Sequence, residues 1–336
     1  MKQATIAIFS PAALKRQLAG IFLARIMARA KVELEAAQLI ELSAADTEKI
    51  SAAMPAAANL NATGNGESMF CIFSGENAVQ AVTEVMKNLR DCFGENLVIS
   101  AAESEVAAAM TAAAAIAARC NLLTSSPASG EERTLLIIKP ENFRAPSVRP
   151  GAIIDMLSSL DLRWVGCKVH HMTTNDALEF YGPVQQALRS KLGPKIGSKA
   201  LAAVESEFAF KFSAAAAEEL VETVGNGFAD DQFEQIVEFM SGKRPSEVPV
   251  EERDDPGTAK CMVLIFDGVD AVARIRTILG PTNPAQAPGG TVRYDFGTDI
   301  MVNASHASDS VESFEREGRI VRVNENDFSS TAKKFA

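Results

Sequence analysis

Two segments from the first third of the chain recur, in the same order, in its second part. The segment that starts at Ala4 (ATIAIFSPAAL) parallels the one that starts at Arg133 (RTLLIIKPENF), and MFCIFSGENAV from Met69 parallels MVLIFDGVDAV from Met262. The spacing is far longer than the roughly 20–50 residues of a solenoid repeat, so it predicts two copies of one domain. A length of 336 residues fits that number of domains.

Hydrophobic periodicity gives each copy the same order of elements. In the first copy we expect strands at 4–9, 32–42, 69–73 and 96–100, helices at 13–29, 76–90 and 104–119, and an irregular connection at 51–66. In the second we expect strands at 134–138, 164–172 and 260–266, a strand end after Val302, and helices at 151–160, 269–279 and 310–319. The order β-α-β-β-α-β is that of a ferredoxin-like fold. The fold class predicted is therefore α/β (α+β): two tandem ferredoxin-like domains with antiparallel sheets.

The predicted boundaries follow from composition. Residues 1–121 form the first domain, and 122–132 (LTSSPASGEE and its flank) have the composition of a linker. Residues 133–336 form the second domain, which carries insertions at about 182–231 and 243–258. The first insertion contains helical pieces such as 215–224, and the second is polar and rich in proline, as solvated loops are.

Charge and cysteine usage narrow the class of protein. The formal net charge is −10, with no basic stripe, which argues against a nucleic-acid partner. The five cysteines are widely spaced and odd in number, so we expect free thiols in a reducing compartment. The longest apolar run, 106–118, is too short to cross a bilayer, and Lys15 and Arg16 interrupt the first apolar stretch. The sequence predicts a cytoplasmic protein without a membrane partner.

Only three histidines are available for catalysis, and two of them, His170 and His171, are expected to be structural in a strand. His306 lies in NASHASDSVESFERE, between a strand and a helix for which Asp309 and Glu312 form a capping-box pattern. Backbone amides at such a helix start are suited to holding phosphate. Taken alone, this placement of His306 is more typical of an ordinary surface histidine than of a catalytic one.

Three basic residues change that balance. Arg293 follows a loop crowded with proline and glycine (GPTNPAQAPGGTV), Arg276 lies on the helix before it, and Lys139 ends a buried strand. Rigid loops of this composition are typical of loops that shape a functional site. Lysine, arginine and imidazole side chains together are typical of a phosphate-binding pocket. Each cation judged singly would be read as a solvated charge.

Residues 134–319 resemble the nucleoside diphosphate kinase family through TLLIIKP, LGPTNPAQAPGGTVRYDFG and NASHASDSVESFERE. The last of these fills the family pattern Asn-x-x-His-[Gly or Ala]-Ser-Asp-Ser-x-x-Ser-x-x-x-Glu at seven positions: Asn303, His306, Ser308, Asp309, Ser310, Ser313 and Glu317. The resemblance implies a nucleoside diphosphate kinase that transfers the γ-phosphoryl group of a nucleoside triphosphate to a nucleoside diphosphate through phosphohistidine, with Mg²⁺ carried by the nucleotide phosphates and no metal site of its own.

The resemblance also implies roles for individual residues. His306 would be the nucleophile, oriented by Glu317, which Ser308 would support. The phosphate and sugar contacts would come from Lys139, Arg276, Thr282, Arg293 and Asn303, and Tyr181 matches a tyrosine near the catalytic histidine. The base-stacking phenylalanine of the family falls near Gln232 or Phe233, with Ile236 opposite. The glycine usual after the loop arginine is Tyr294 here.

The first copy lacks this chemistry. It has Ser10 where the second copy has Lys139, Ile99 or Ser100 at the position of the nucleophile, and no histidine before residue 170. We expect it to be catalytically silent and to serve the assembly, so that the chain is a homo-oligomer or an internal pseudo-dimer. The alternative reading is a nucleotide-binding regulatory or scaffold protein with impaired catalysis.

Overall fold

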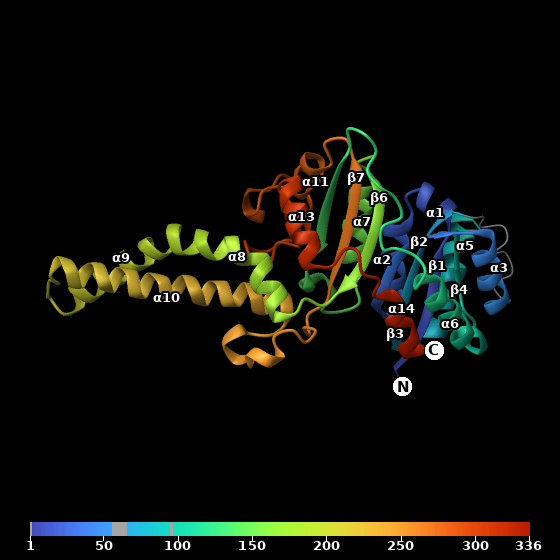
Figure 1. Ribbon diagram of the computed structural model, residues 1–336, viewed down its shortest axis with the longest axis horizontal. Coiled ribbons are helices and arrows are strands. Elements are labelled where there is room, and N and C mark those ends of the chain that lie inside the picture. Colours follow the sequence, from blue (N-terminus) through green and yellow to red (C-terminus); the bar gives the residue numbers. More distant parts are fainter. Residues whose placement is uncertain (1, 56–65, 95–96) are drawn as a thin grey trace. The chain divides into compact units, whose positions relative to one another are not determined.

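The computed structural model describes residues 2–55, 66–94 and 97–336. These residues form two compact units, one made of residues 1–170 and 261–336 and the other of residues 171–260. The first unit contains both sheets of the protein (Figure 1), and the second is a helical insertion. In the described part of the chain no helix is both long and apolar enough to span a membrane.

The first copy is a four-stranded antiparallel sheet in the order β2-β3-β1-β4. Its elements are β1 (Lys2–Phe9), α1 (Pro11–Lys15), α2 (Ala19–Ala30), β2 (Glu33–Leu42), α3 (Ala44–Ala53), β3 (Gly66–Glu76), α5 (Ala78–Phe93), β4 (Val98–Ser100) and α6 (Val106–Ala117). This strand order and the crossing helices are those of the predicted ferredoxin-like fold.

The second copy repeats that topology with the order β6-β7-β5-β8. Its elements are β5 (Glu132–Ile138), α7 (Arg149–Ser158), β6 (Arg163–His170), β7 (Cys261–Gly268), α11 (Ala271–Leu279), α12 (Val292–Phe296), β8 (Ser305–Ala307) and α13 (Val311–Ile320). The fold class predicted from the sequence is therefore confirmed: the protein is mixed α/β with two antiparallel ferredoxin-like sheets.

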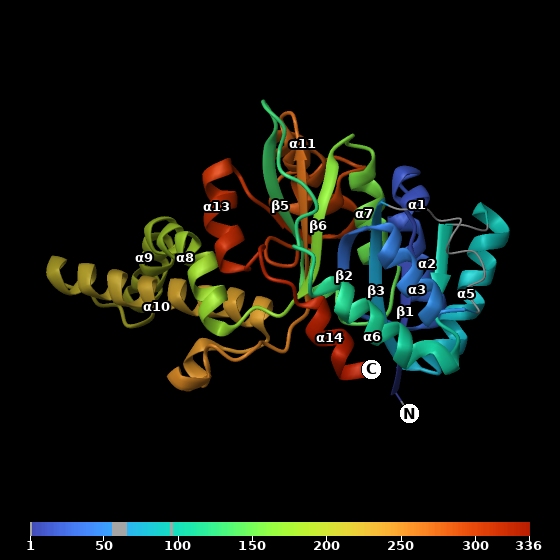
Figure 2. The ribbon, with the colours of Figure 1, turned by 45° about the vertical axis from the view of Figure 1, so that its right-hand side comes forward.

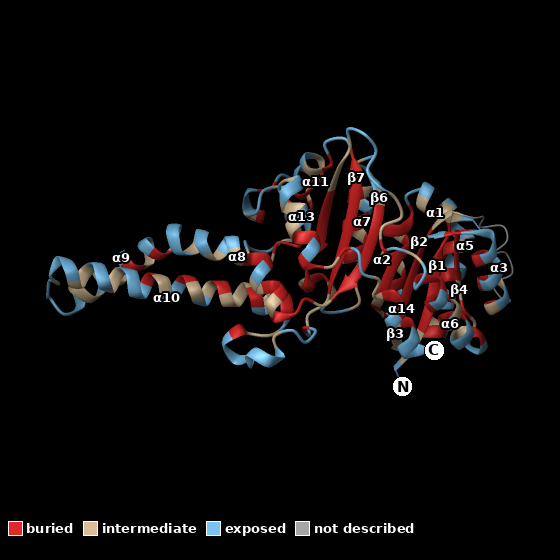
Figure 3. Ribbon diagram, in the orientation of Figure 1, coloured by how far each residue is buried: buried red, intermediate tan, exposed pale blue. Residues whose placement is uncertain are grey.

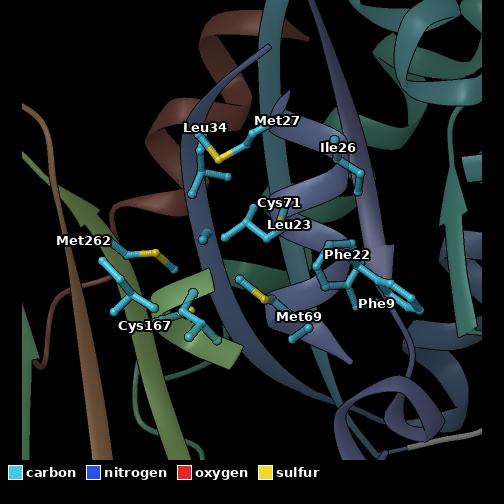
Figure 4. Close-up of a cluster of buried hydrophobic side chains, with 14 of the residues drawn as sticks. Phe9, Phe22, Leu23, Ile26, Met27, Leu34, Met69, Cys71, Cys167 and Met262 are labelled. Carbon is cyan, nitrogen blue, oxygen red and sulfur yellow. The ribbon is translucent and has the colours of Figure 1, made fainter. Parts of the chain in front are cut away.

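One hydrophobic core joins the two copies (Figure 3). Figure 4 shows Cys167 and Met262 of the second sheet beside Leu34 and Met69 of the first, and all four are buried in the same cluster. The contacts are made by equivalent elements, α2 with α7 and β2 with β6. Gly20 of α2 and Gly151 of α7 lie at the helix contact, where each has backbone atoms of the other helix around it. The copies thus pair through corresponding surfaces within one chain.

The C-terminal segment of the second copy packs on the first. Helix α14 (Phe328–Phe335) lies against α6 and β2 (Figure 2), and Phe328 and Ala332 are buried in the outer core of the first copy. Lys168 in β6, only 2% exposed, anchors the segment because its Nζ donates to the Arg322 carbonyl at 3.0 Å and pairs with Asp327 at 2.9 Å. No sequence pattern predicts this packing of residues 322–335, which we call the C-terminal clasp.

The second unit consists mainly of three helices, α8 (Thr174–Lys191), α9 (Gly193–Glu207) and α10 (Ala214–Ser241). Small residues allow α9 and α10 to pack closely, because a Cβ on Gly197 would lie 2.0 Å from the Val221 carbonyl oxygen. The helical pieces expected at 215–224 belong to α10, which is much longer than expected. The segment at 243–258 has only the short 3₁₀ turns Pro245–Glu247 and Val250–Glu252.

Three local expectations were wrong. The helix expected at 13–29 is two helices, α1 and α2, separated where Gln17 adopts a φ of 57°. Part of the connection expected at 51–66 belongs to α3, which Ser43 and Asp46 cap reciprocally, and residues 56–65 lie outside the described residues. The linker expected at 122–132 stays a prediction: Leu122 is buried and Thr124 hydrogen-bonds to β6, whereas residues 126–130 are exposed. The cap of α13 is Ser310, and not Asp309 as expected.

Candidate active site

The candidate site is built on β8 at the edge of the second sheet. His306 is the central residue of β8 and pairs with Ile137 of β5. Because alternate strand residues face opposite sides, both side chains lie on the sheet face opposite Leu136 and Ile138, which point into the shared core. Helix α13, which follows β8 in the chain, packs against β5 and carries Glu317.

Glu317 fixes the imidazole of His306. Its Oε2 lies 3.0 Å from Nε2 of His306 and also accepts from the Ser308 hydroxyl at 2.8 Å, while Arg316 contacts Oε1 at 3.2 Å. Glu317 is buried, whereas the side chain of His306 is 25% exposed. An ionised carboxylate that accepts Nε2–H selects the tautomer whose Nδ1 carries the lone pair. The three residues therefore have the arrangement of an oriented nucleophile.

Lys139 approaches the same strand from the end of β5. Its Nζ donates to the Met301 carbonyl and to Oδ1 of Asn303, both at 2.8 Å. Burial lowers the pKa of Lys139 to about 8, with Arg293 adding to the decrease and Glu141 opposing it. Asn303 in turn donates to the Thr282 carbonyl at 3.1 Å, which ties the proline-rich loop to the site.

Arg293 lies on α12 and contacts β8 from the other side. Its guanidinium donates to the carbonyls of Gly280 at 2.7 Å and Ser305 at 3.1 Å, while the buried Nε has no hydrogen-bond partner within the described part of the chain. Burial lowers the pKa of Arg293 to about 10, and the positive charge of Arg276 contributes. Two cations held near one another, one with an unused donor, form a site that an anion would stabilise.

Two residues that the sequence did not single out hold this site in shape. Ala304 has a φ of 69°, a left-handed conformation that costs an alanine energy, and Glu141 accepts its N–H at 2.7 Å. Asn142 donates to the Ala304 carbonyl at 2.9 Å and to the Lys139 carbonyl at 3.1 Å. Burial raises the pKa of Glu141. The only signal in the sequence was their position directly after Lys139-Pro140.

The structure thus brings together most of the residues predicted for the site. Hydrogen bonds join Lys139, Asn303 and Thr282 in one group and His306, Ser308 and Glu317 in another. Arg293 donates to the carbonyl of Ser305, the residue before His306, and Arg276 lies near Arg293 and Asp309. Tyr181, Phe233 and Ile236 belong to the second unit, where Tyr181 and Phe233 are 7% and 3% exposed. Their roles, base stacking at Phe233 in particular, stay predictions.

Among the residues of the first copy that the structure describes, there is no such site. Its β1–β4 pairing sets Ile8 opposite Ile99, as Ile137 is set opposite His306 in the second copy. Ser10, at the position of Lys139, caps α1 by accepting the Ala13 N–H. The helix after β4 is the alanine-rich α6, which contains no acidic residue equivalent to Glu317. Of the two residues expected at the nucleophile position, the register selects Ile99.

Comparisons with known proteins point to one family. The nucleoside diphosphate kinase family model matches residues 252–326. The nucleoside diphosphate kinase of Helicobacter pylori (strain P12) is 30% identical over 188 residues, which cover 56% of this chain and 92% of that protein. That of Campylobacter curvus is 29% identical over 204 residues, 61% of this chain and 98% of the relative.

Solved structures of the same family also match. The Aquifex aeolicus nucleoside diphosphate kinase is 25% identical with a TM-score of 0.34, covering 57% of this chain and 94% of that one. The Encephalitozoon cuniculi enzyme is 20% identical with a TM-score of 0.36, covering 61% and 99%. On the coverage and identity of the sequence relatives, this chain belongs to the nucleoside diphosphate kinase family.

Proposed function

We propose that the protein is an active nucleoside diphosphate kinase in which His306 carries the phosphoryl group. The observation that supports this most directly is the His306–Glu317–Ser308 arrangement, with Nε2 of His306 held at 3.0 Å by a buried carboxylate. With Nε2 engaged, Nδ1 is the nitrogen that would attack the γ-phosphorus. The oriented imidazole lies on β8, where the Ser305 carbonyl accepts from Arg293, and Lys139 donates to Asn303 just before that strand.

The reaction would proceed in two symmetric halves. Nδ1 of His306 forms a bond to the γ-phosphorus of the magnesium-bound nucleoside triphosphate, the bond to the β,γ-bridging oxygen breaks, and the nucleoside diphosphate leaves with that oxygen's electron pair. A second nucleoside diphosphate then takes the phosphoryl group back from Nδ1. Lys139, Arg276 and Arg293 would neutralise the charge that spreads over the phosphoryl oxygens, which is the main requirement of this chemistry.

The electrostatics of the site support an anionic substrate. The Arg293 Nε lacks a hydrogen-bond partner among the described residues, and both Lys139 and Arg293 have pKa values lowered by burial. A bound phosphate would give the guanidinium its missing acceptor and would favour the charged forms of both groups. The magnesium ion enters with the nucleotide as part of the substrate.

The test is phosphoryl labelling of the full chain. Incubation with γ-labelled ATP should label His306 in an acid-labile, base-stable form, and added nucleoside diphosphate should remove the label. His306→Gln should abolish labelling and lower transfer by about 10⁵–10⁶-fold. His171→Gln is the matched control and should retain both.

The same experiment separates the enzyme from a nucleotide-binding regulatory or scaffold protein. Such a protein would bind the nucleotide without label or transfer. Label that persists in His306→Gln would place the nucleophile elsewhere and contradict the mechanism.

A further inference from the structure

A cavity of about 480 Å³ lies where the two copies meet, away from His306. Apolar side chains of both copies form one wall of the cavity: Leu14 and Leu39 of the first copy, and Ile154 and Leu157 of the second. None of the predicted site residues lines the cavity. Its volume is within the range of about 300–1,000 Å³ that small-molecule pockets occupy. Because both copies contribute wall, an occupant would contact both.

An aromatic pair forms another part of the wall. Trp164 is stacked on Phe266 with ring centroids 6.3 Å apart and an interplanar angle of 21°. The indole N–H is already used, since it donates to the Gly166 carbonyl at 2.9 Å. Trp164 therefore offers the cavity an apolar, electron-rich surface and no hydrogen-bond donor.

Two carboxylates share the cavity with this apolar surface. Glu41 in β2 is directly opposite Glu67 in β3, and both line the cavity. Like charges directly opposite across a sheet destabilise it. Glu67 accepts a hydrogen bond from Thr124 at 2.5 Å, yet among the residues that the structure describes neither carboxylate has a basic side chain within ion-pair distance. Burial raises the pKa of Glu67, and the charge of Glu41 adds to this.

Two basic side chains also border the cavity. Arg163 is occupied by ion pairs with Glu131 at 2.6 Å and Asp267 at 3.4 Å, and Lys15 is exposed on the C-terminal end of α1. Arg163 therefore compensates Glu67 only at longer range. The two facing carboxylates are therefore the acidic groups of the wall that a cationic occupant could match.

We propose that this cavity binds a small organic cation, an ammonium group carried on an aromatic or aliphatic body. The ammonium would lie against Glu41 and Glu67 and relieve their repulsion, and the body would pack on Trp164 and the leucine-lined wall. Cations also bind favourably over the face of an indole ring. Nucleotides would be disfavoured here because their phosphates would meet two carboxylates. The proposal concerns a ligand other than the substrate and stands apart from the activity proposed for His306.

Ligand binding in this cavity can be followed by Trp164 fluorescence, because Trp164 is the only tryptophan in the sequence. The experiment titrates the full chain with phenethylamine and follows Trp164 emission, with 2-phenylethanol as the uncharged analogue and phenylacetate as the anionic one. Phenethylamine should give a saturable change and raise the melting temperature, since it binds the folded state across both copies. The uncharged analogue should bind at least about tenfold more weakly.

Two variants test the role of the carboxylates. Glu67→Gln and Glu41→Gln should each weaken phenethylamine binding by about tenfold, and Glu41 is exposed, so its substitution leaves the fold intact. Glu48→Gln, at an exposed position of α3, is the matched control and should bind like the unaltered protein. The proposal is overturned if phenylacetate binds as tightly as phenethylamine, if Glu41→Gln leaves the affinity unchanged, or if Trp164 emission shows no saturation up to about 10 mM ligand.

Discussion

The contact between α2 and α7 makes a sharp prediction about Gly20. A Cβ at this position would lie 2.5 Å from the Asp155 backbone nitrogen and 2.7 Å from the Gly151 carbonyl oxygen. These atoms are backbone, so they cannot rotate away as a side chain would. An ordinary contact begins at 3.4 Å, so Gly20→Ala must separate the two helices by roughly 1 Å.

The expected cost follows from that displacement. Overpacking a well-packed interface typically costs about 1–3 kcal/mol, and a gap of about 1 Å forfeits up to half of each dispersion contact along it. We expect Gly20→Ala to lower the free energy of unfolding by about 2–3 kcal/mol. With a urea dependence of about 2–3 kcal/mol per molar, the unfolding midpoint should decrease by about 1 M.

The assay is urea unfolding followed by Trp164 fluorescence, which reports on the unit that contains both copies. Gly227→Ala is the matched control, because a Cβ there meets nothing within 4 Å and Gly227 lies in α10 of the other unit. It should leave the Trp164 transition in place. Gly20→Ala should still be labelled at His306 in the absence of urea, since α2 and α7 carry none of the proposed site residues.

A midpoint for Gly20→Ala within about 0.2 M of the unaltered protein would refute the close helix contact. The reciprocal substitution gives a second check. A Cβ on Gly151 would lie 2.3 Å from the Ala24 nitrogen, so Gly151→Ala should be equally destabilising. The double variant should lose less than the two single losses added, because one separation of the helices accommodates both methyl groups.

Three further predictions concern the site and the C-terminal clasp. Glu317→Gln should lower the rate of phosphoryl transfer by about 10²–10⁴-fold with little change in nucleotide affinity, because it removes the charged acceptor that orients His306. Equal losses in transfer rate and in nucleotide affinity would contradict an orienting role. Lys139, with its pKa of about 8, is charged below that pH and neutral above it, so kcat/KM should decrease as pH rises through about 8, and a flat profile to about pH 9.5 would contradict this. Lys168→Met leaves the Arg322 carbonyl without its donor and should destabilise the clasp by about 1–3 kcal/mol, measured as faster proteolysis of the C-terminal segment than in the unaltered protein; an unchanged rate would show that the buried lysine does not hold it.

Much of the fold and the centre of the site followed from local sequence. Short, nearly continuous apolar runs such as MFCIF and TLLII placed most of the strands because a strand buried on both faces must be apolar throughout, and the internal repeat predicted two sheets of one topology. The histidine motif placed His306 between a strand and a helix and Glu317 on that helix, and the observed 3.0 Å contact agrees with that spacing, although His306 itself lies in the middle of β8. These features depend on a few neighbouring residues, so they can be read without knowledge of the tertiary structure.

The tertiary structure decided what depends on distant segments. Only the packing shows that α14 covers the first copy, that Gly20 faces Gly151, and that Glu41 lies beside Glu67 at a cavity. Each of these contacts joins residues from segments that share no local sequence pattern. The break between α1 and α2 depends on a single positive φ at Gln17 that helix propensity does not encode. Whether a segment forms a strand or a helix is determined largely by its neighbouring residues. Which surfaces pair is determined by how closely their buried side chains pack, and a linear hydrophobic pattern does not encode that packing.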